Sequence, residues 1–263
     1  MNKKSAALPL IALSALAALS IALPAGAQST KSPHQSGRPP LTERPVGDKA
    51  ILRTMADAVG MIRGVGPFES VKTINRLQWN GSGVVQGVKA DYSYSLSLAL
   101  MAAREDVRPK DGGRRTVEVV NGAKAWNEVT PGVGMTPADG EVLARRAKLD
   151  RTPFAFSKAA FLATPGSVVV TDPGGSGPVT VTMPIDGIET TAVLDTDFRP
   201  RTVTQTVNGR KIEVTYTDYA DLSEYGLMFP QRIVEKTDGK TTMDVKVTDV
   251  RVASYAIFDP PTQ

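Results

Sequence analysis

The chain contains 263 residues, no cysteine and a single histidine. The absence of cysteine excludes disulfides, thiol catalysis, thiolate metal sites and lipidation at a mature N-terminus, and one histidine cannot form a histidine zinc site. The formal net charge of +4 is small and its charges are dispersed, so the composition does not indicate a nucleic-acid partner.

Residues 1–27 have the pattern of a cleaved secretion signal. A short charged start at 2–4 precedes an apolar run at 6–23, and 25–27 reads Ala-Gly-Ala, which matches the A-x-A cleavage pattern. A transmembrane anchor is the alternative interpretation, but the run is rich in alanine and serine and is interrupted by proline. We therefore expect cleavage after Ala27 and a periplasmic protein.

A spacer and a helix follow the signal. Residues 28–47 combine prolines with serine, threonine, glycine and arginine, which predicts a flexible spacer; the histidine, His34, lies within it and is expected to be incidental. Asp48 is a typical N-cap for a helix over 48–63, whose apolar residues form one stripe. We expect this helix to lie against a sheet and to open a single domain over 48–260.

Strand patterns and turn dipeptides alternate in the next segment. The clearest strand pattern runs over 90–104, where apolar side chains at even positions alternate with serine and alanine. Turn composition occurs at Asn80-Gly81, at 110–113 and at Asn121-Gly122. We predict strands over 68–79, from 84 to 89, over 90–104, 116–120 and 124–129, with a long connection at 104–115.

Two short helices are predicted between the strands. After a loop at 131–140, residues 141–148 and 154–163 have helical patterns, and Pro153 marks the start of the second. Short apolar helices that interrupt a run of hairpins need a surface to cover. We expect them to lie over the concave face of the sheet and to act as a movable lid.

Residues 179–258 predict a continuous β-meander with one apolar face. Apolar and polar residues alternate with a period of two, and Asp186-Gly187, Asn208-Gly209 and Asp238-Gly239 are dipeptides typical of two-residue hairpin turns. The apolar phase slips after Val247, which predicts a β-bulge near Asp249.

No motif indicates catalysis, a metal or a cofactor. The chain has no nucleophile elbow, phosphate-binding loop, dinucleotide-binding loop or EF-hand. Asp195-Thr196-Asp197 resembles the turn of an aspartic protease, but that turn requires glycine where Asp197 stands. The remaining candidate carboxylates show no spacing that would pair any two of them for glycoside chemistry; they are Glu141, Asp150, Asp218, Asp221 and Glu224. We expect a protein that is not an enzyme.

The chain contains more apolar side chains than an ordinary core of this size would require. Most of them are expected to form an ordinary core, but a curved sheet lidded by two short helices also leaves room for an apolar ligand. The candidate ligand-binding residues are Trp79, Tyr92, Tyr94, Leu96, Leu98, Leu100, Trp126, Phe154 and Phe161.

The order of elements resembles the periplasmic lipoprotein carriers of the LolA and LolB superfamily. The resemblance rests on the signal peptide, the first helix, the Gly-x-x-x-Trp segment at 122–126, the stretch Tyr225–Ile233 and the closing Phe258–Pro260. It implies an α+β, mainly β fold: a curved antiparallel sheet forming an unclosed half β-barrel, with an N-terminal helix and a short-helix lid.

The resemblance also implies a function. It suggests a soluble, non-catalytic periplasmic carrier or chaperone that binds a lipid, lipoprotein acyl chains or another hydrophobic ligand, with acylated proteins and envelope membrane proteins as partners. The alternative is an envelope structural, interaction or sensor module whose sheet is filled by its own side chains.

Overall fold

The computed structural model describes residues 43–61, 74–174, 177–223, 226–253, 256 and 258–261. All of them belong to one compact unit of the chain, residues 33–263. The predicted signal at 1–27 and most of the predicted spacer lie outside the described residues. Within the described ranges, no helix combines the length and apolar character needed to cross a membrane.

The described strands form one antiparallel sheet of thirteen strands. Those before the helical segment are β1 Arg76–Val85, β2 Val88–Ser97, β3 Ala102–Pro109, β4 Thr116–Asn121, β5 Lys124–Glu128 and β6 Thr136–Pro137. Those after it are β7 Val169–Thr171, β8 Thr180–Ile185, β9 Ile188–Leu194, β10 Pro200–Val207, β11 Arg210–Asp221, β12 Met228–Thr237 and β13 Lys240–Val252.

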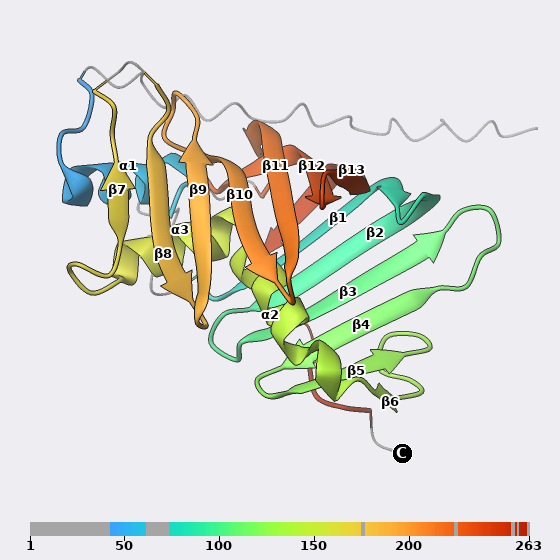
Figure 1. Cartoon of the computed structure of the whole chain (residues 1–263). Coiled ribbons are helices and arrows are strands. Elements are labelled where there is room, and N and C mark those ends of the chain that lie inside the picture. Colours follow the sequence, from blue (N-terminus) through green and yellow to red (C-terminus); the bar gives the residue numbers. More distant parts are fainter. Residues whose placement is uncertain are drawn as a thin grey trace, which may run out of the picture. The chain divides into compact units, whose positions relative to one another are not determined.

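The strand order explains why the sheet stays open. Each strand pairs with its neighbour in sequence, except that β1 at the centre pairs with β13. The edges of the sheet are therefore β6 and β7, which do not pair with each other. The helices at Val142–Asp150 and Pro153–Leu162 are inserted between these two edge strands and fold back across one face of the sheet (Figure 1). The predicted mainly β fold with an unclosed sheet is confirmed.

Three α-helices accompany the sheet in the described part of the chain: α1 Asp48–Ala58, α2 Val142–Asp150 and α3 Pro153–Leu162, with a 3₁₀ turn, η2 Asp139–Glu141, before α2. Helix α1 contacts α3, α3 contacts β10, and α2 contacts β3, β4 and β5 on one side and β10 on the other. The face that they cover is called the inner face below. The two short helices predicted after the first strands are confirmed on this face.

The ends of α1 differ from the prediction. Gly47, not Asp48, is the N-cap, and the helix ends at Ala58, five residues before the predicted end at 63. Gly60 follows with a φ of +82°, and a Cβ there would lie 1.9 Å from the carbonyl oxygen of Gly226. The chain therefore turns at Gly60 because only glycine allows both this conformation and this close approach.

The predicted turn at Asn80-Gly81 is wrong, because both residues lie inside β1. A Cβ on Gly81 would lie 2.3 Å from the carbonyl oxygen of Lys246 on β13, so this glycine serves close strand approach rather than chain reversal. The pairing of β1 with β13 skips Thr248 at this point. The predicted β-bulge near Asp249 is thus confirmed.

The predicted long strand over 90–104 is also wrong. Strand β2 ends at Ser97, the chain turns at 98–101 with Met101 at a φ of +48°, and β3 returns from Ala102. The first half of the predicted connection at 104–115 is consequently strand, and the predicted turn at 110–113 follows it. Alternating apolar residues continued through the turn and concealed it.

The predicted strand from 84 to 89 is wrong, because it contains the turn between β1 and β2 at Gln86-Gly87, where both residues have positive φ. The hairpin of β4 with β5 and the three two-residue turns of the meander agree with the prediction. Strands β4 and β5 pair around Asn121-Gly122, and the turns Asp186-Gly187, Asn208-Gly209 and Asp238-Gly239 all have positive φ at both residues. Of the first predicted strand, residues 68–73 lie outside the described residues. The inner-face side chains of the meander are buried with those of β1, β2 and the helices in one large apolar core.

Candidate functional site

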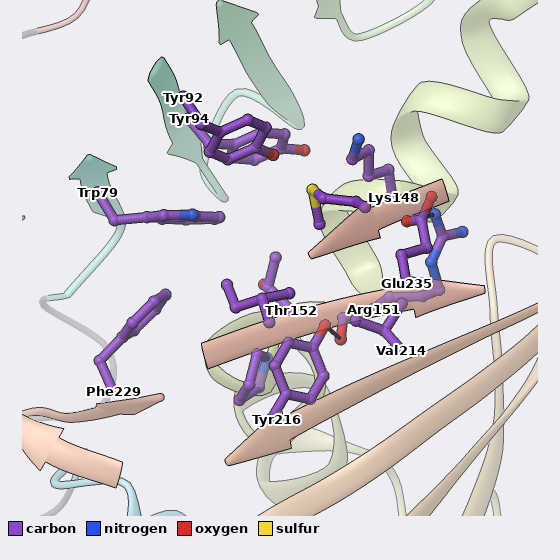
Figure 2. A pocket seen from close by; sticks show the side chains of 13 residues that line it. Trp79, Tyr92, Tyr94, Lys148, Arg151, Thr152, Val214, Tyr216, Phe229 and Glu235 are labelled. Carbon is purple, nitrogen blue, oxygen red and sulfur yellow. Dashed lines mark hydrogen bonds and ion pairs between the residues drawn. The ribbon is translucent and has the colours of Figure 1, made fainter. Parts of the chain in front are cut away.

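An aromatic pocket lies in the inner face beneath the C-terminal end of α2 (Figure 2). Its cavity has about 20 Å³ that a water molecule could occupy, so the side chains nearly fill it. The residues that line it are Trp79, Tyr92, Tyr94, Lys148, Arg151, Thr152, Pro153, Val214, Tyr216, Phe229, Ile233, Glu235 and Met243. They come from β1, β2, β11, β12, β13 and the junction of α2 with α3.

Stacked aromatic rings form one wall of this pocket. Tyr92 and Tyr94 are two residues apart on β2, so both face inward, and their ring centroids are 6.5 Å apart. The Tyr94 ring stacks on Trp79 at 4.6 Å, and Phe229 lies 5.1 Å from Trp79. Burial, reinforced by the nearby carboxylate of Glu105, raises the pKa of both tyrosines well above its usual value. Both phenols are therefore neutral donors at neutral pH.

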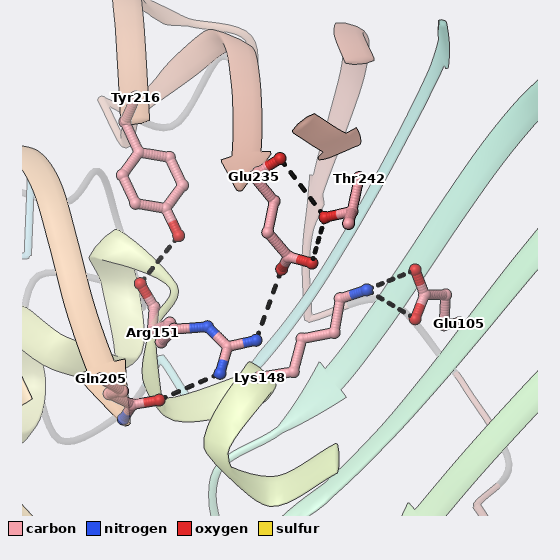
Figure 3. A network of polar contacts seen from close by, with 7 residues as sticks. All are labelled: Glu105, Lys148, Arg151, Gln205, Tyr216, Glu235 and Thr242. Atoms are coloured by element: carbon pink, nitrogen blue, oxygen red, sulfur yellow. Dashed lines mark hydrogen bonds and ion pairs between the residues drawn. The ribbon is translucent and has the colours of Figure 1, made fainter. Parts of the chain in front are cut away.

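A network of buried polar groups forms the opposite wall (Figure 3). Lys148 Nζ lies 2.6 and 2.8 Å from the two carboxylate oxygens of Glu105 on β3. Arg151 donates from Nη1 to Gln205 on β10 at 3.0 Å and from Nη2 to Glu235 on β12 at 3.4 Å. Tyr216 on β11 donates to the carbonyl oxygen of Arg151 at 2.8 Å. These contacts connect the end of α2 to β3 in one half of the sheet and to β10, β11 and β12 in the other half.

The charges in this network are balanced. Burial is the largest single effect on Lys148 and opposes its ionisation, but the carboxylates of Glu105 and Glu235 together outweigh burial and raise its pKa. Burial likewise opposes ionisation of Glu235, but Lys148 and Arg151 lower its pKa below the usual value. Lys148 and Glu235 therefore remain charged in a largely apolar surrounding. Such buried pairs hold position well but stabilise a fold less than apolar packing of the same volume does.

Three of the residues that the sequence singled out meet in this pocket: Trp79, Tyr92 and Tyr94. Leu96 and Phe154 are buried in the adjoining core, and Leu98 and Phe161 pack half-buried against it. Leu100 lies in the turn after β2 and is 47% exposed. These last five do not line the pocket.

Trp126 lies on the other face of the sheet. On β5, Ala125 belongs to the inner core, and the next side chain consequently points outward. Trp126 packs there with Val117, Val119 and Met135 in a separate cluster. The structure therefore does not bring Trp126 together with the other candidate ligand-binding residues.

Sequence reasoning missed the polar half of the site. Lys148 lies on α2 and Arg151, its C-cap residue, follows three positions later with helical backbone angles, which places both side chains on one face. Glu235 follows Ile233 at the same phase of β12, so a charge occupies an inward position. These two signals, a cation pair on a lid helix and a carboxylate on an apolar strand face, could have found the network.

A second, larger hollow opens at the ends of β9, β10 and β11. It has a volume of about 830 Å³ and mixed polar and apolar walls that include Arg44, Phe198, Arg199, Arg201 and Tyr219. Tyr216 lines both this cleft and the aromatic pocket, so its side chain separates the two.

The protease-like Asp195 lies on the wall of this cleft and holds a turn together. Its Oδ1 accepts hydrogen bonds from the backbone N–H groups of Asp197 at 2.9 Å and Arg199 at 2.8 Å. The Arg199 side chain also pairs with Asp195 and lies over the ring of Tyr219. These contacts account for both aspartates as turn residues.

The other candidate carboxylates are dispersed. Asp150 is buried at the end of α2, and burial, followed by the nearby Asp186, raises its pKa to about 7. Asp221 accepts backbone hydrogen bonds from Ser223 and Gly226, and Glu224 lies outside the described residues. Within the described part of the chain, no cluster of three or more His, Cys, Asp or Glu side chains could hold a metal ion.

No protein-family model matches the chain, and no curated protein matches its sequence. Among solved structures, it is similar to a LolA superfamily protein of Nitrosomonas europaea, with 16% identity and a TM-score of 0.42 over 82% of this chain and 96% of that one. It is also similar to an uncharacterized conserved protein of Thermus thermophilus, with 10% identity and a TM-score of 0.33 over 78% and 87%. The first belongs to the superfamily that the sequence resembles. Both TM-scores lie below 0.5, and neither similarity assigns a function to this chain.

Proposed function

We propose that this protein is a non-catalytic periplasmic carrier of a lipid, the acyl chains of a lipoprotein, or another hydrophobic ligand. The ligand would lie on the inner face of the open sheet, against Trp79, Tyr94 and Phe229, with α2 as the lid. Acylated proteins would deliver or receive it at the envelope membranes. The proposed location rests on the signal-like segment at 1–27.

One observation supports this proposal above the others: an aromatic pocket is closed by a helix that is held through polar contacts. When a helix end held by apolar packing opens, its apolar surface becomes exposed to water. When α2 opens, Leu149 is exposed in this way, but water can also solvate Lys148, Arg151 and their two carboxylate partners. Because a buried ion pair gains little over its solvated groups, this closure is a comparatively weak one.

The small cavity sets a requirement on the mechanism. About 20 Å³ cannot hold an acyl chain, so binding requires α2 to move away from β11 and β12. Burial of about 10–16 CH₂ groups at roughly 0.8 kcal/mol each supplies a gross drive of about 8–13 kcal/mol. This gross drive exceeds the small net stabilisation that a buried ion pair provides over its solvated groups.

The same small cavity favours a second candidate function. A sheet filled by its own side chains suits a structural, interaction or sensor module of the envelope. In that case α2 would be a fixed part of the core, and the buried ion pairs would fix its orientation. The two functions differ in whether α2 moves.

Cross-linking α2 to the sheet distinguishes the carrier from the module. Because the chain contains no cysteine, introduced cysteines are the only thiols that a maleimide can label. Arg146 Nη2 on α2 lies 2.5 Å from Asp186 Oδ2 in the turn between β8 and β9. A variant with Arg146→Cys and Asp186→Cys, bridged by a short bismaleimide, should fix α2 to the sheet. The carrier should take up the fluorescent probe N-phenyl-1-naphthylamine before bridging and lose uptake after it.

Two single-cysteine variants, each capped with a monofunctional maleimide, are the controls and should keep uptake. Organic extraction of the purified protein followed by lipid mass spectrometry should also reveal a bound lipid. A protein that carries no lipid and takes up no probe in its unbridged form would exclude the carrier and leave the module.

A further inference from the structure

The carboxyl group of Asp150 is buried at the end of α2 with an unsatisfied oxygen. The residue is 5% exposed, and its Oδ2 atom has no hydrogen-bond partner in the described part of the chain. An ionised carboxylate that loses its hydration needs hydrogen-bond donors in exchange, and buried polar atoms without a partner are rare in native proteins. This position is therefore unfavourable for an ionised carboxylate and suits a protonated one.

Two further features of the position oppose ionisation. Asp150 is the last residue of α2, where the helix dipole disfavours negative charge. Asp186, in the turn between β8 and β9, is a second carboxylate nearby and acts against a charge on Asp150. The phenol of Tyr94 is also near, but it is neutral and cannot compensate that charge.

The two cations near Asp150 are already engaged with other carboxylates. Arg146 Nη2 lies 2.5 Å from Asp186 Oδ2, and Arg151 Nη2 donates to Glu235 at 3.4 Å (Figure 3). Each guanidinium keeps a buried Nε without a partner among the described residues. An ionised Asp150 would therefore compete with Asp186 for Arg146 and with Glu235 for Arg151.

These two ion pairs connect the end of α2 to the sheet. The pair of Arg146 joins the helix to the turn between β8 and β9, and the pair of Arg151, the C-cap residue, joins it to β12. Competition from an ionised Asp150 would weaken both connections at once. The protonation of one carboxyl group thus controls how firmly the helix end is held.

We propose that Asp150 is a proton-sensitive switch for α2: the helix end is held to the sheet while this carboxyl group is protonated, and it is released when the group ionises. The proposal rests on the movement of α2 that the proposed function requires, and it adds a regulator to that movement. A carrier with this switch opens for its ligand as the pH rises and closes again as the pH falls.

The pH range of the switch follows from the two states of Asp150. Burial, followed by the nearby Asp186, raises its pKa to about 7 in the closed structure, and solvation on opening returns the pKa toward its ordinary value of 3.8. The closed state therefore holds a proton that the open state has released. As the pH rises from 5 to 8, the equilibrium constant for opening should increase roughly hundredfold, and most of this increase should occur below pH 7.

A cysteine on the covered side of α2 measures this opening without any ligand. Ala147 on α2 is 1% exposed, so the thiol of Ala147→Cys reacts with a maleimide only when α2 opens, and the chain has no other thiol. The labelling rate at each pH is divided by the rate of the same variant unfolded in urea, which removes the ionisation of the thiol itself. This normalised rate should rise roughly hundredfold from pH 5 to pH 8 and stay nearly constant when Asp150→Asn is added.

Ala192→Cys is the matched control, because Ala192 is equally buried on β9 and reports opening of the whole sheet. It should label at least roughly tenfold more slowly than Ala147→Cys, since local opening is easier than global unfolding. Asp186→Asn is a second variant in case Asp150→Asn does not fold. It removes the nearby anion, so the rise in labelling of Ala147→Cys should end at a lower pH.

The outcomes distinguish the switch from the carrier function. A normalised rate that is constant from pH 5 to pH 8, or that rises equally with Asp150→Asn, overturns the switch and leaves the movable lid. Equal labelling of Ala147→Cys and Ala192→Cys overturns the switch and the movable lid together. The expected pH dependence in a protein that takes up no N-phenyl-1-naphthylamine supports the switch and rejects the carrier.

Discussion

The two tryptophans of this chain lie on opposite faces of the same sheet and differ in how fully their polar groups are satisfied. Trp126 donates from Nε1 to Glu128 at 2.8 Å, and the same carboxylate also binds Arg104 at 2.9 Å and the backbone N–H of Gly132 at 2.7 Å. Trp79 is as deeply buried, yet its Nε1 has no partner in the described part of the chain.

The difference distinguishes a finished structural cluster from an incomplete site. On the outer face, Trp126 Nε1 and both carboxylate oxygens of Glu128 have hydrogen-bond partners, so this tryptophan and its acceptor need no ligand. On the inner face, Trp79, Arg151 and Asp150 each retain a buried polar atom without a partner among the described residues. Burial of a tryptophan alone therefore says little about function. A buried polar atom without a hydrogen-bond partner beside a pocket, by contrast, indicates where a ligand can bind.

Removal of Glu128 should break the outer cluster and give the largest effect. Glu128→Ala would take the acceptor from Trp126 and Gly132 and the carboxylate from Arg104, all at a buried position. We expect the free energy of unfolding to fall by about 3–5 kcal/mol, as is typical for breaking a buried pair. Urea denaturation measures it, and a loss below about 1 kcal/mol would show that this face is not the completed cluster described above.

Asp150 should make the inner face respond to pH. Burial, followed by the nearby Asp186, raises its pKa from 3.8 to about 7, while Arg146 and Arg151 act in the opposite direction. The folded protein therefore holds a proton that the unfolded chain has released. Raising the pH from 4 to 7 should lower the contribution of this group to the free energy of unfolding by about 3 kcal/mol.

The difference between wild type and Asp150→Asn isolates this contribution, because the variant cannot titrate there. Urea denaturation at several pH values should show that the variant gains stability relative to wild type as the pH rises toward 7. Other carboxylates with lowered pKa values, such as Glu235 and Asp106, act in the opposite direction but are common to both proteins. A constant difference across this range would rule out a raised pKa.

The same substitution at the two tryptophans sharpens the comparison. Trp126→Phe leaves the Glu128 carboxylate without one donor and opens a space, whereas Trp79→Phe opens a similar space but removes a donor that had no partner. We expect Trp126→Phe to cost about 2 kcal/mol more than Trp79→Phe, since hydrogen bonds to charged groups contribute about 1.5–3 kcal/mol. Equal losses in urea denaturation would mean that Trp79 is satisfied in solution.

Much of the fold could be predicted from local signals in the sequence. Dipeptides such as Asn208-Gly209 fix both the turn and the register of a hairpin, and the phase slip after Val247 located a bulge. The predictions were wrong where the same residue types served another structural role. Asn80-Gly81 has turn composition, but Gly81 is required by the close approach of β13.

The site was predictable only on its apolar side. Tyr92 and Tyr94 followed from the period of β2, and Trp79 was correctly placed among them. The polar side depends on contacts between residues far apart in the chain, such as Lys148 with Glu105 and Arg151 with Glu235. The strand order brings these partners together. That order depends on the pairing of β1 with β13, which no local sequence pattern predicts.

The turn after β2 marks where the inner face ends, and it gives the smallest predicted effect. Leu96 is 1% exposed and belongs to the core, whereas Leu100 is 47% exposed beyond the end of the strand. Leu96→Ala should lower the free energy of unfolding by about 2–5 kcal/mol, and Leu100→Ala by less than about 0.5 kcal/mol. If Leu100→Ala instead weakened binding of N-phenyl-1-naphthylamine without lowering stability, the inner face would continue through this turn, and the pocket would be larger than its present walls.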